Sequence, residues 1–377
     1  MKTVAIICEY DPFHRGHSRQ IELIRERFGK DTAVISLMSG SVVQRGRLAV
    51  YPKHNRAAAA VTCGSDLVLE LPAPYACASA EAFARGAVTL LNRLGGIDFL
   101  CFGSESGDLA ALTESADILR SEAYREALRL APDDESHPRK AAEVFASLGG
   151  TEFPTRPNDI LAVQYLAALR DLKSTIVPFT YRRESGFSAS ASRKLLLEGD
   201  DASPMIPEEA LAIFASQSPT PTAPYDAIAL QYLRETDPTQ LARYYGMNGG
   251  VAGLLHKTAL TVTTVEALIE KATCRTYTAS RLRRAILAAV LDTVADAPKE
   301  LPSFTNLLAT NERGRAHLHA IRKTADIAIV TKPADGLTLP SPAREQFLFG
   351  QKADRLMSLC RGEAPDETMK RSPLMFP

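Results

Sequence analysis

Short apolar runs alternate with longer amphipathic stretches along the first half of the chain. The runs are rich in β-branched and aromatic residues and are too short to be free-standing helices, so they predict buried strands. The stretches between them carry apolar residues at helical spacing. The predicted strands are residues 3–8, 32–38, 66–71, 97–102 and 175–179, and the predicted helices are residues 17–28, 53–63, 79–93, 107–129, 139–148 and 158–171.

This alternation predicts an α/β fold. Strands separated by helices pair in parallel through right-handed crossovers, with helices on both faces of the sheet. We therefore expect a Rossmann-like, parallel-sheet catalytic domain over residues 1–200. Ligands of such sheets bind at the carboxyl ends of the strands, so the residues that follow each strand are the first candidates for a site.

The pattern changes after residue 200. Residues 201–224 are rich in proline and predict a linker. Residues 225–377 show helical patterns with few candidate strands, and they predict a mostly α-helical second domain. We expect the tail from Pro365 to be loosely ordered.

Composition narrows the classes of function. Apolar residues make up 45% of the 377 positions, which excludes a disordered or fibrous chain. The 44 Lys and Arg residues balance 44 Asp and Glu residues, so a nucleic acid would have to be met by a local patch. Six scattered cysteines without a CxxC pair favour a reducing cytoplasm, and no apolar stretch approaches the ~18 residues of a membrane span.

The clearest chemical signal follows the first predicted strand, in the run ICEYDPFHRGHSRQ over residues 7–20. His14 and His17 lie three residues apart where a helix begins, so they share one face of it. Together with free backbone N–H groups and the helix dipole, they form an anion site suited to a polyphosphate. Fixed donors of this kind stabilise the charge that develops in nucleotidyl transfer. HxGH also arises by chance, and we expect no metal site because no third ligand with zinc-like spacing lies nearby.

A second signal follows the last predicted strand, in YRRESGFSASASRKL over residues 181–195. Hydroxyl groups and a guanidinium at a helix N-terminus can form a second phosphate cradle, facing the first. Helix capping and a solvated basic turn explain the serines alone more simply. The residues concerned are Arg182, Arg183, Ser188, Ser190, Ser192 and Arg193.

These two motifs carry a resemblance to a known family. HRGH and SASASR resemble the HxGH and S-S-T-x-x-R motifs of the HIGH-type nucleotidyltransferase superfamily, whose members attack the α-phosphate of a nucleotide. More narrowly, the chain resembles the bacterial tRNA(Met) cytidine acetate ligase family from residue 1 past residue 320. The matching segments are, in order, EYDPFHRGH, MSGSVVQRG, DLVLELP, EAFARGAV, FGSE, RPNDILAVQYL and NERGRAHL.

The resemblance implies an ATP-dependent ligase. Such an enzyme activates acetate as acetyl-AMP with release of pyrophosphate, and then passes the acetyl group to the wobble cytidine of elongator tRNA(Met), forming N4-acetylcytidine. ATP is then a substrate, and Mg²⁺ is its expected counter-ion. The expected partners are acetate and elongator tRNA(Met). We do not expect the protein to bind DNA.

Carried over by position, the resemblance assigns His14 and His17 as catalytic residues that stabilise the pentacovalent α-phosphate. A side chain at Gly103 would block the base or ribose, and Asn158 can both donate and accept. The ATP-binding residues so implied are Ile7, Cys8, Glu9, Tyr10, Asp11, Pro12, Phe13, His14, Arg15, Gly16, His17, Ser18, Arg19, Gln20, Gly103, Asn158, Arg183, Ser190 and Arg193.

The chain departs from the family pattern in both motifs. Asp11 stands where the family has Asn, and its charge would repel a polyphosphate unless it is turned away or used for magnesium. The second motif has Ser190 in place of Thr, and Ser192 in place of an aliphatic residue, while Arg193 is kept.

Acetate needs a cation beside the polyphosphate that it attacks. Arg45 or Lys53, after the second strand, can supply it, although a solvated basic helix start explains these residues equally well. Glu81 and Glu105 are conceivable bases. Acetate is already an anion, so the first step needs none.

Residues 270–323 form the candidate tRNA surface, because ten Lys or Arg residues there are interleaved with Tyr277, His317 and His319. Phosphate contacts and stackable rings suit a single-stranded anticodon loop. A solvated charged face is the alternative. The candidate tRNA-binding residues are Lys271, Arg275, Arg281, Arg283 and Arg284.

Two other functions stay open. A small-molecule adenylyltransferase would keep AMP on its product, but it would need little beyond the sheet domain. A non-catalytic RNA-binding protein could carry a relic nucleotide pocket, but His14, Gly16, His17 and Arg193 are intact.

Overall fold

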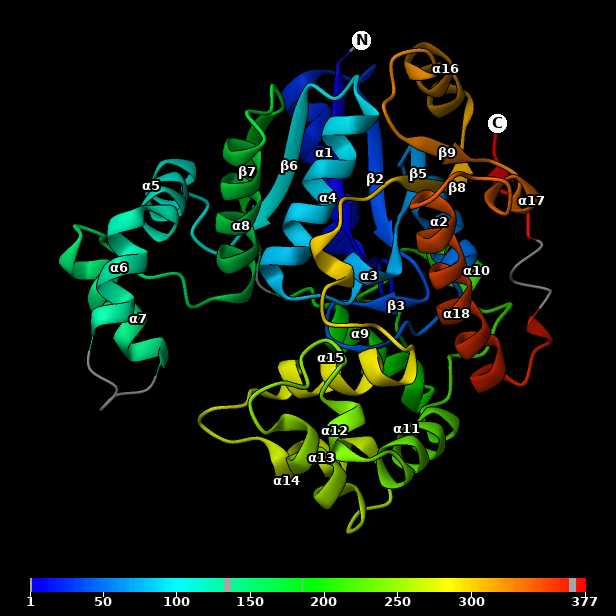
Figure 1. Cartoon of the computed structure of the whole chain (residues 1–377). Coiled ribbons are helices and arrows are strands. Elements are labelled where there is room, and N and C mark those ends of the chain that lie inside the picture. The colour runs from blue at the N-terminus through cyan, green and yellow to red at the C-terminus, as the bar shows by residue number, and fades with distance from the viewer. Residues whose placement is uncertain (1, 132–136, 185, 366–370) are drawn as a thin grey trace.

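The central element of the structure is a sheet with helices on both faces, above a lobe built of helices (Figure 1). This computed structural model describes residues 2–131, 137–184, 186–365 and 371–377. Five central strands are parallel and stand in the order β5-β2-β1-β6-β7. Their bounds are Thr3–Cys8 for β1, Ala33–Ser39 for β2, Leu67–Leu71 for β5, Phe99–Ser104 for β6 and Val177–Arg182 for β7.

These strands lie where the apolar runs predict them, with ends shifted by a few residues. β2 and β5 are buried along their whole length, as expected of strands covered on both faces. The register places Cys8 beside Met38, so the carboxyl ends of β1 and β2 finish at one level. The predicted α/β class with its parallel sheet is confirmed.

The predicted helices are present between these strands, and one of them is divided. Ser121 ends α5 and caps α6, because its hydroxyl accepts a hydrogen bond from the Tyr124 N–H at 3.0 Å. The helix expected over 107–129 is therefore two helices. The bounds are Arg15–Phe28 for α1, Lys53–Thr62 for α2, Ala73–Ala76 for α3, Ala80–Leu94 for α4, Leu109–Arg120 for α5, Glu122–Leu130 for α6, His137–Ser147 for α7, Pro157–Asp171 for α8 and Ala189–Glu198 for α9.

Residues 201–224, expected to be a linker, contain helix α10 (Glu208–Phe214). Phe214 stacks on Tyr51 with ring centroids 4.5 Å apart, and Ile206 and Ala210 are buried in the same apolar cluster. The segment therefore packs on α2 instead of bridging two separate bodies.

The region expected to be one helical domain, residues 225–377, divides into two parts. Its first part forms the helical lobe, and the core around Leu255, Leu268 and Leu282 continues into the β3–β4 hairpin, α3 and α18. Its second part returns to the sheet, where β8 (Phe304–Thr310) pairs antiparallel with β5. The expectation of one helical domain is thus corrected. The helices concerned are α11 (Ala223–Glu235), α12 (Pro238–Leu241), α13 (Val251–Ala259), α14 (Val265–Ala272) and α15 (Ala279–Val290) in the lobe, and then α16 (Glu312–Ile321), α17 (Pro333–Gly336) and α18 (Ala343–Arg361).

Three further pairs of strands complete the architecture. β9 (Ala328–Val330) and β10 (Leu374–Met375) pair in parallel with β8, and β3 (Val42–Val43) and β4 (Arg47–Leu48) form a hairpin after β2. The tail from Pro365 was expected to be loosely ordered. Its residues 366–370 lie outside the described part of the chain, and β10, which follows them, belongs to the sheet. No helix among the described residues combines the length and the apolar character that a membrane span requires.

One buried arginine joins the carboxyl ends of β1 and β2. Arg56, on α2, is fully buried. Its guanidinium donates hydrogen bonds to the carbonyl oxygens of Glu9 at 2.5 Å, Ser39 at 3.1 Å and Tyr51 at 3.0 Å, and also to that of Gly40. These carbonyls belong to the loops that leave the sheet. Arg56 therefore fixes the segments from which the candidate site is built.

Replacing Arg56 by Met should lower the free energy of unfolding by about 3–5 kcal/mol, because buried carbonyl oxygens lose their donor and nearby carboxylates lose their counter-charge. Urea unfolding followed by circular dichroism measures this change. Arg344→Met, at an exposed position of α18, is the matched control and should cost less than about 0.5 kcal/mol. Equal effects of the two substitutions would contradict the bridging role of Arg56.

Candidate active site

The loop that follows β1 is held by one tyrosine in an unusual backbone conformation. Tyr10 has a φ of 46°, in the left-handed region that non-glycine residues rarely adopt. Its hydroxyl lies 2.9 Å from the Ser36 hydroxyl, and its ring packs against Phe13 and His17 with centroids 4.9 and 4.8 Å away. The turn therefore delivers the following residues to the start of α1 at the carboxyl edge of the sheet.

His14 and His17 stack on each other at that edge, with ring centroids 3.8 Å apart. Nδ1 of His14 accepts a hydrogen bond from the Gly16 N–H at 3.1 Å, and Nδ1 of His17 accepts one from the His14 N–H at 3.1 Å. An imidazole nitrogen that accepts carries no proton, so each neutral ring holds its proton on Nε2. The helix start thus fixes two rings as Nε2–H donors.

Burial and nearby cations keep both rings neutral. Burial lowers the pKa of His14 to about 4, and the guanidinium groups of Arg183 and Arg193 act in the same direction. The pKa of His17 lies well below its usual range because of burial, His14 and Arg183. At neutral pH the pair therefore presents two N–H donors without carrying charge of its own.

The two sequence motifs meet in a small pocket. Gly16 is required there, because a Cβ at this position would lie 2.9 Å from Cε1 of His14 and 3.3 Å from Cβ of Phe187. Sequence reasoning did not single out Tyr181, Glu184 and Phe187, although they lie in or beside the second motif. The lining residues are His14, Gly16, His17, Arg19, Tyr181, Arg183, Glu184 and Phe187.

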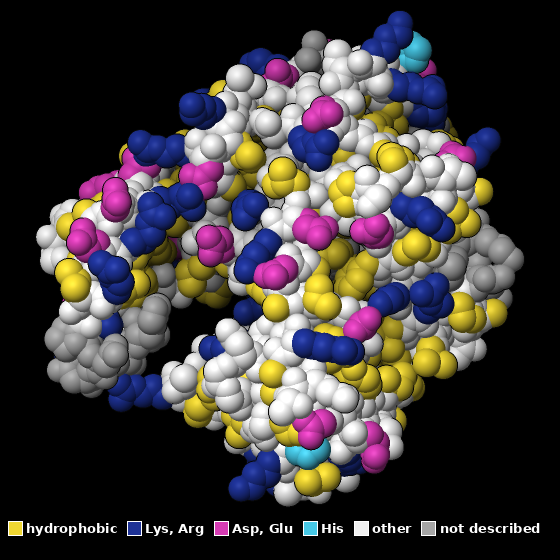
Figure 2. Space-filling model, viewed as in Figure 1, with side chains coloured by type: hydrophobic (Ala, Val, Ile, Leu, Met, Phe, Trp, Pro, Cys, Tyr) yellow, Lys and Arg dark blue, Asp and Glu magenta, His cyan; other side chains and the backbone are white. Residues whose placement is uncertain are grey.

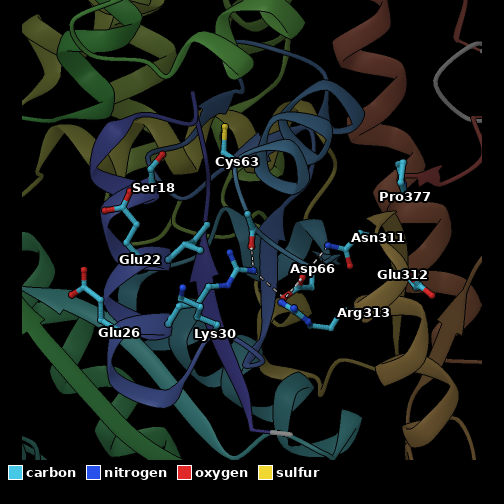
Figure 3. A pocket seen from close by; sticks show the side chains of 13 residues that line it. Ser18, Glu22, Glu26, Lys30, Cys63, Asp66, Asn311, Glu312, Arg313 and Pro377 are labelled. Atoms are coloured by element: carbon cyan, nitrogen blue, oxygen red, sulfur yellow. Dashed lines mark hydrogen bonds and ion pairs between the residues drawn. The ribbon is translucent and has the colours of Figure 1, made fainter.

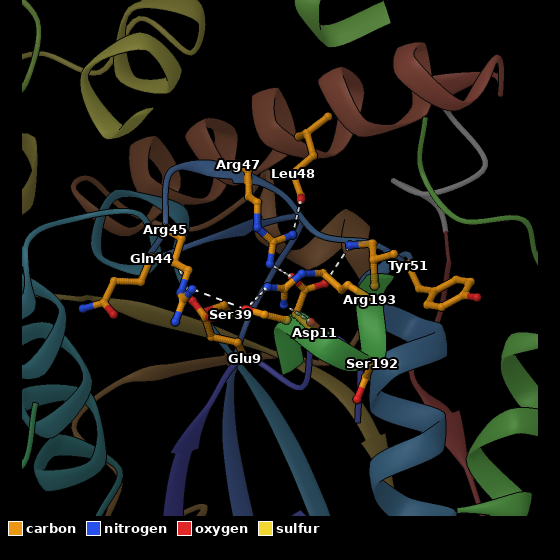
Figure 4. Close-up of polar contacts among 12 residues, drawn as sticks. Glu9, Asp11, Ser39, Gln44, Arg45, Arg47, Leu48, Tyr51, Ser192 and Arg193 are labelled. Carbon is orange, nitrogen blue, oxygen red and sulfur yellow. Dashed lines mark hydrogen bonds and ion pairs between the residues drawn. The ribbon is translucent and has the colours of Figure 1, made fainter. Parts of the chain in front are cut away.

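The second motif fastens α9 to the loop after β1 (Figure 4). Arg193 donates from Nη1 to the carbonyl oxygen of Asp11 at 2.6 Å and from Nη2 to the Ser190 hydroxyl at 2.9 Å. Ser188 caps the helix through the Ala191 N–H, and Ser192 is buried with its hydroxyl donating to the Ser188 carbonyl. Arg193 and Ser190 thus face the candidate site, whereas the other two serines serve the helix.

Asp11 does not line the small pocket beside His14 and His17. Its Oδ1 accepts a hydrogen bond from the Val50 N–H at 2.6 Å, and its Oδ2 pairs with Arg47. Burial alone would raise the pKa of Asp11, but Arg47, Arg56 and Arg193 outweigh it and hold the pKa below the usual value. Its carboxylate is therefore a fixed counter-charge within the arginine cluster, and both oxygens already have donors.

On the opposite side of β1, the end of β6 is joined to the start of α8. Glu105 accepts hydrogen bonds from Nδ2 of Asn158 at 2.6 Å and from the Asp159 N–H at 2.9 Å. Arg183 donates to Oδ1 of Asn158 at 3.5 Å. A Cβ at Gly103 would lie 2.8 Å from Cγ of Arg183, so glycine is needed for this close approach. The structure thus brings Gly103, Asn158 and Arg183 together.

Several residues of the run 7–20 are buried in the sheet or bind neighbouring segments and do not line the small pocket. The Cys8 thiol is buried, and burial raises its pKa above the usual range. Gln20 donates to a carbonyl of β6 at 3.2 Å, and Arg15 donates to the Ser203 carbonyl at 3.0 Å.

A pocket of about 790 Å³ lies beside α1 and the start of α16 (Figure 3). Asp66 pairs there with Arg25 at 3.4 Å and with Arg313 at 3.5 Å, and accepts a hydrogen bond from Asn311 at 2.9 Å. Ser18 lines this pocket. The ion cluster joins α1, β5 and α16 and lies apart from the histidine pair.

The two residues predicted to meet acetate differ in their surroundings. Arg45 is exposed, with its Nη1 3.5 Å from the Ser190 hydroxyl. Lys53 is buried and pairs with Glu70 at 2.9 Å and Asp354 at 2.8 Å. Its ammonium is already neutralised by two carboxylates, so the expectation that Lys53 binds acetate is corrected.

The residues predicted to bind tRNA do not form one free patch. Arg283 pairs with Glu266 at 2.6 Å, and Arg284 is half-buried with its Nη1 3.5 Å from the Gln44 carbonyl of the hairpin. Basic and acidic side chains are interspersed on the face shown in Figure 2. Lys271 and Arg275 are exposed, and Arg281 is half-buried with its Nη2 3.2 Å from Oδ1 of Asn248.

His317 and Arg313, later in the segment 270–323, lie on α16 and not on the lobe. His317 is buried, with its Nδ1 3.5 Å from the hydroxyl of Thr3. Arg313 belongs to the Asp66 cluster. Thr3 begins β1, so α16 lies at the amino edge of the sheet, opposite the lobe (Figure 1). The candidate surface is thus restricted to the lobe.

This geometry agrees with comparisons to known proteins. The chain matches the HIGH nucleotidyl transferase family over residues 1–372. It is 36% identical to tRNA(Met) cytidine acetate ligase of Syntrophotalea carbinolica, over 88% of this chain and 85% of the relative, and 32% identical to that of Acetivibrio thermocellus, over 92% of each. The chain belongs to the tRNA(Met) cytidine acetate ligase family. A crystal structure of Thermotoga maritima TmcAL bound with alpha-thio ATP covers 100% of both chains with a TM-score of 0.91 at 27% identity.

The neutral histidine pair gives this member of the tRNA(Met) cytidine acetate ligase family a specific dependence of stability on pH. In the unfolded chain the imidazole takes up a proton below about 6.5, whereas the folded protein keeps His14 neutral down to about 4. The unfolded state therefore binds more protons in this window, and the stability due to His14 should be lost as the pH falls. The loss from this ring alone should reach about 3 kcal/mol at pH 4.

Urea unfolding at a series of pH values between 4 and 7 measures this effect. His14→Asn keeps an N-capping side chain but removes the imidazole, so its stability should depend less on pH. His319→Asn, on the exposed side of α16, should behave like the wild type. A wild type and a His14→Asn variant with the same slope would show that His14 is not held neutral.

Proposed function

We propose that this protein is an ATP-dependent ligase that joins acetate to AMP and then acetylates the wobble cytidine of elongator tRNA(Met). The observation that carries the proposal is the meeting of two neutral histidine donors with arginines at the ends of β1 and β2. Relatives that share about a third of its residues over most of the chain bear the name of this activity.

The phosphate pocket supports the activation step. The Nε2–H groups of His14 and His17, the guanidinium of Arg183 and the N-terminus of α1 supply donors for the triphosphate. Acetate attacks the α-phosphorus and pyrophosphate leaves. The fixed donors stabilise the charge that builds up on the pentacovalent phosphorus. No base is needed, because acetate arrives ionised.

The polar cluster beside this pocket supports a place for the acetate. Four guanidinium groups surround two carboxylates there, which leaves positive charge in excess. Arg45 is its exposed cation, and we assign it to the acetate carboxylate. The cluster consists of Arg45, Arg47, Arg56, Arg193, Glu9 and Asp11.

Mg²⁺ would enter as the counter-ion of ATP. No group of three or more His, Cys, Asp and Glu side chains is placed to hold a metal ion within the described ranges of the chain. The phosphate oxygens are ligands of the kind that Mg²⁺ prefers. The ion would shield the triphosphate charge, and the nucleotide would supply its ligands.

The helical lobe supports a place for tRNA below the carboxyl edge of the sheet. Arg281 stacks over the Tyr277 ring at 5.1 Å, a combination of cation and aromatic surface suited to an unpaired base and its phosphates. Lys271 and Arg275 are exposed nearby in the chain. The lobe contacts the β3–β4 hairpin through Arg284, so RNA bound there lies on the side of the arginine cluster.

Exchange of labelled pyrophosphate into ATP tests the activation step, with a panel of small carboxylates and with none. The proposed ligase should exchange only with acetate or a close analogue. His14→Asn should lower the exchange rate by about 10²–10³, the scale of losing one transition-state donor, while His319→Asn should leave it unchanged. Exchange is measured alongside thermal unfolding, so that loss of a donor is separated from loss of the fold.

Either of two results would contradict this function. Exchange at full rate without any carboxylate would favour an adenylyltransferase with a different acceptor. ATP binding without exchange, for every carboxylate tested, would favour an RNA-binding protein with a relic pocket.

Reversing the charge of Lys271 and Arg275 to Glu should weaken tRNA binding. The dependence of log affinity on log salt should also become shallower, by about one for each phosphate that the protein no longer neutralises. Filter binding over a range of salt concentrations measures both. The matched control reverses Arg322 and Lys323, which are exposed at the end of α16 on the opposite edge. If both pairs weaken binding equally, the lobe is not the tRNA surface.

A further inference from the structure

The second half of the proposed reaction has a requirement that the first half lacks. When the cytidine amine attacks the acetyl carbon, its nitrogen becomes positively charged and must lose a proton before AMP can leave productively. Acetate brings no such proton to the activation step. The transfer step therefore needs a proton acceptor within reach of the cytidine amine.

Four titratable groups of the candidate site, His14, His17, Asp11 and Glu105, are unsuited to accept this proton. His14 and His17 hold their protons on Nε2, and their Nδ1 atoms are occupied by backbone donors. Both carboxylate oxygens of Asp11 are taken by Val50 and Arg47. Both oxygens of Glu105 are taken by the start of α8.

Glu9 is different. It directly follows β1, and its side chain reaches toward the β3–β4 hairpin, where Oε1 accepts a hydrogen bond from the Gln44 N–H at 2.6 Å (Figure 4). Across the described ranges of the chain, Oε2 accepts no hydrogen bond and forms no ion pair. One oxygen therefore anchors the carboxylate, and the other remains open.

The surroundings of Glu9 make it a stronger base than a surface glutamate. Burial and the charge of Asp11 raise its pKa, and Arg47, the Gln44 N–H and Arg45 oppose that shift only in part. Its neighbours include Arg45, which we assign to the acetate. An acetyl group formed at Arg45 would therefore be presented beside the open oxygen of Glu9.

We propose that Glu9 is the general base of acetyl transfer, with Oε2 taking a proton from the exocyclic amine of the cytidine. As the bond from that nitrogen to the acetyl carbon forms, the bond from the carbon to the phosphate oxygen breaks. AMP leaves with the electron pair of the broken bond, and the proton remains on Glu9. This assignment rests on the proposed function and gives its second step a named acceptor.

Synthetic acetyl-AMP bypasses activation and isolates this step. Mixed with tRNA(Met) and excess protein in a single turnover, it yields acetylcytidine that can be counted by mass spectrometry of nucleosides. The wild-type rate should rise with pH through the titration of Glu9 and then level off. Glu9→Gln keeps an acceptor for the Gln44 N–H, so it should fold, but its rate should fall by about 10²–10⁴ and lose that pH dependence.

Two further variants separate a base from a structural residue. Glu9→Ala should be slow and should be partly restored by added formate, a carboxylate that cannot be activated because ATP is absent. Glu122→Gln, at an exposed position of α6, should transfer acetyl at the wild-type rate.

The outcomes are distinguishable. A Glu9→Gln variant that transfers at the wild-type rate, or that is slow but keeps the wild-type pH profile, would overturn the role of Glu9. A slow Glu9→Ala variant that formate does not restore would do the same. A wild-type protein that makes no acetylcytidine from acetyl-AMP would overturn the proposed function itself, and the role of Glu9 with it.

Discussion

The guanidinium of Arg56 lies in the interior, where a charge is stable only if hydrogen bonds and counter-charges replace the water that it has lost. Backbone carbonyls from the ends of β1 and β2 provide those bonds, and Asp11 and Glu9 provide the charge. Without this arginine, the segments that follow β1 and β2 would not be held together at this point. Because one side chain binds several of them, the loops that carry the site are fixed relative to one another before any ligand arrives.

The site combines two kinds of group, neutral hydrogen-bond donors and charged guanidinium groups. The stacked histidines are neutral donors, held so by burial and by their own helix start. The arginines carry the charge, and Asp11 pairs with Arg47 and supports Arg193 so that they keep fixed positions. A neutral donor beside fixed cations can stabilise charge that develops during reaction without holding the triphosphate too tightly beforehand. The proposed base, Glu9, lies among the arginines, beside Asp11 and the hairpin residue Gln44.

The sequence predicted the features that depend on local interactions. The five parallel strands follow from β-branched apolar runs, and the two histidines at the start of α1 follow from HxGH placed between a strand and a helix. The antiparallel β8 was missed, because its seven residues are flanked by helical patterns and its pairing with β5 spans more than 200 residues of chain. The partners of Lys53 and Arg284 could not be predicted either. Lys53 pairs with Asp354, and Arg284 lies beside a carbonyl of the β3–β4 hairpin. Both partners are remote in sequence, so no local pattern indicates them.

The central claim is that the site makes a mixed anhydride by attack of acetate on the α-phosphate. Acetate labelled with ¹⁸O in its carboxylate tests that claim, with the protein, ATP and tRNA(Met) and with mass spectrometry of the products. Attack at the α-phosphorus and later cleavage of the bond from carbon to oxygen should leave one labelled oxygen in AMP. AMP without label, or label in phosphate or pyrophosphate, would show that acetate attacks elsewhere and would contradict the account.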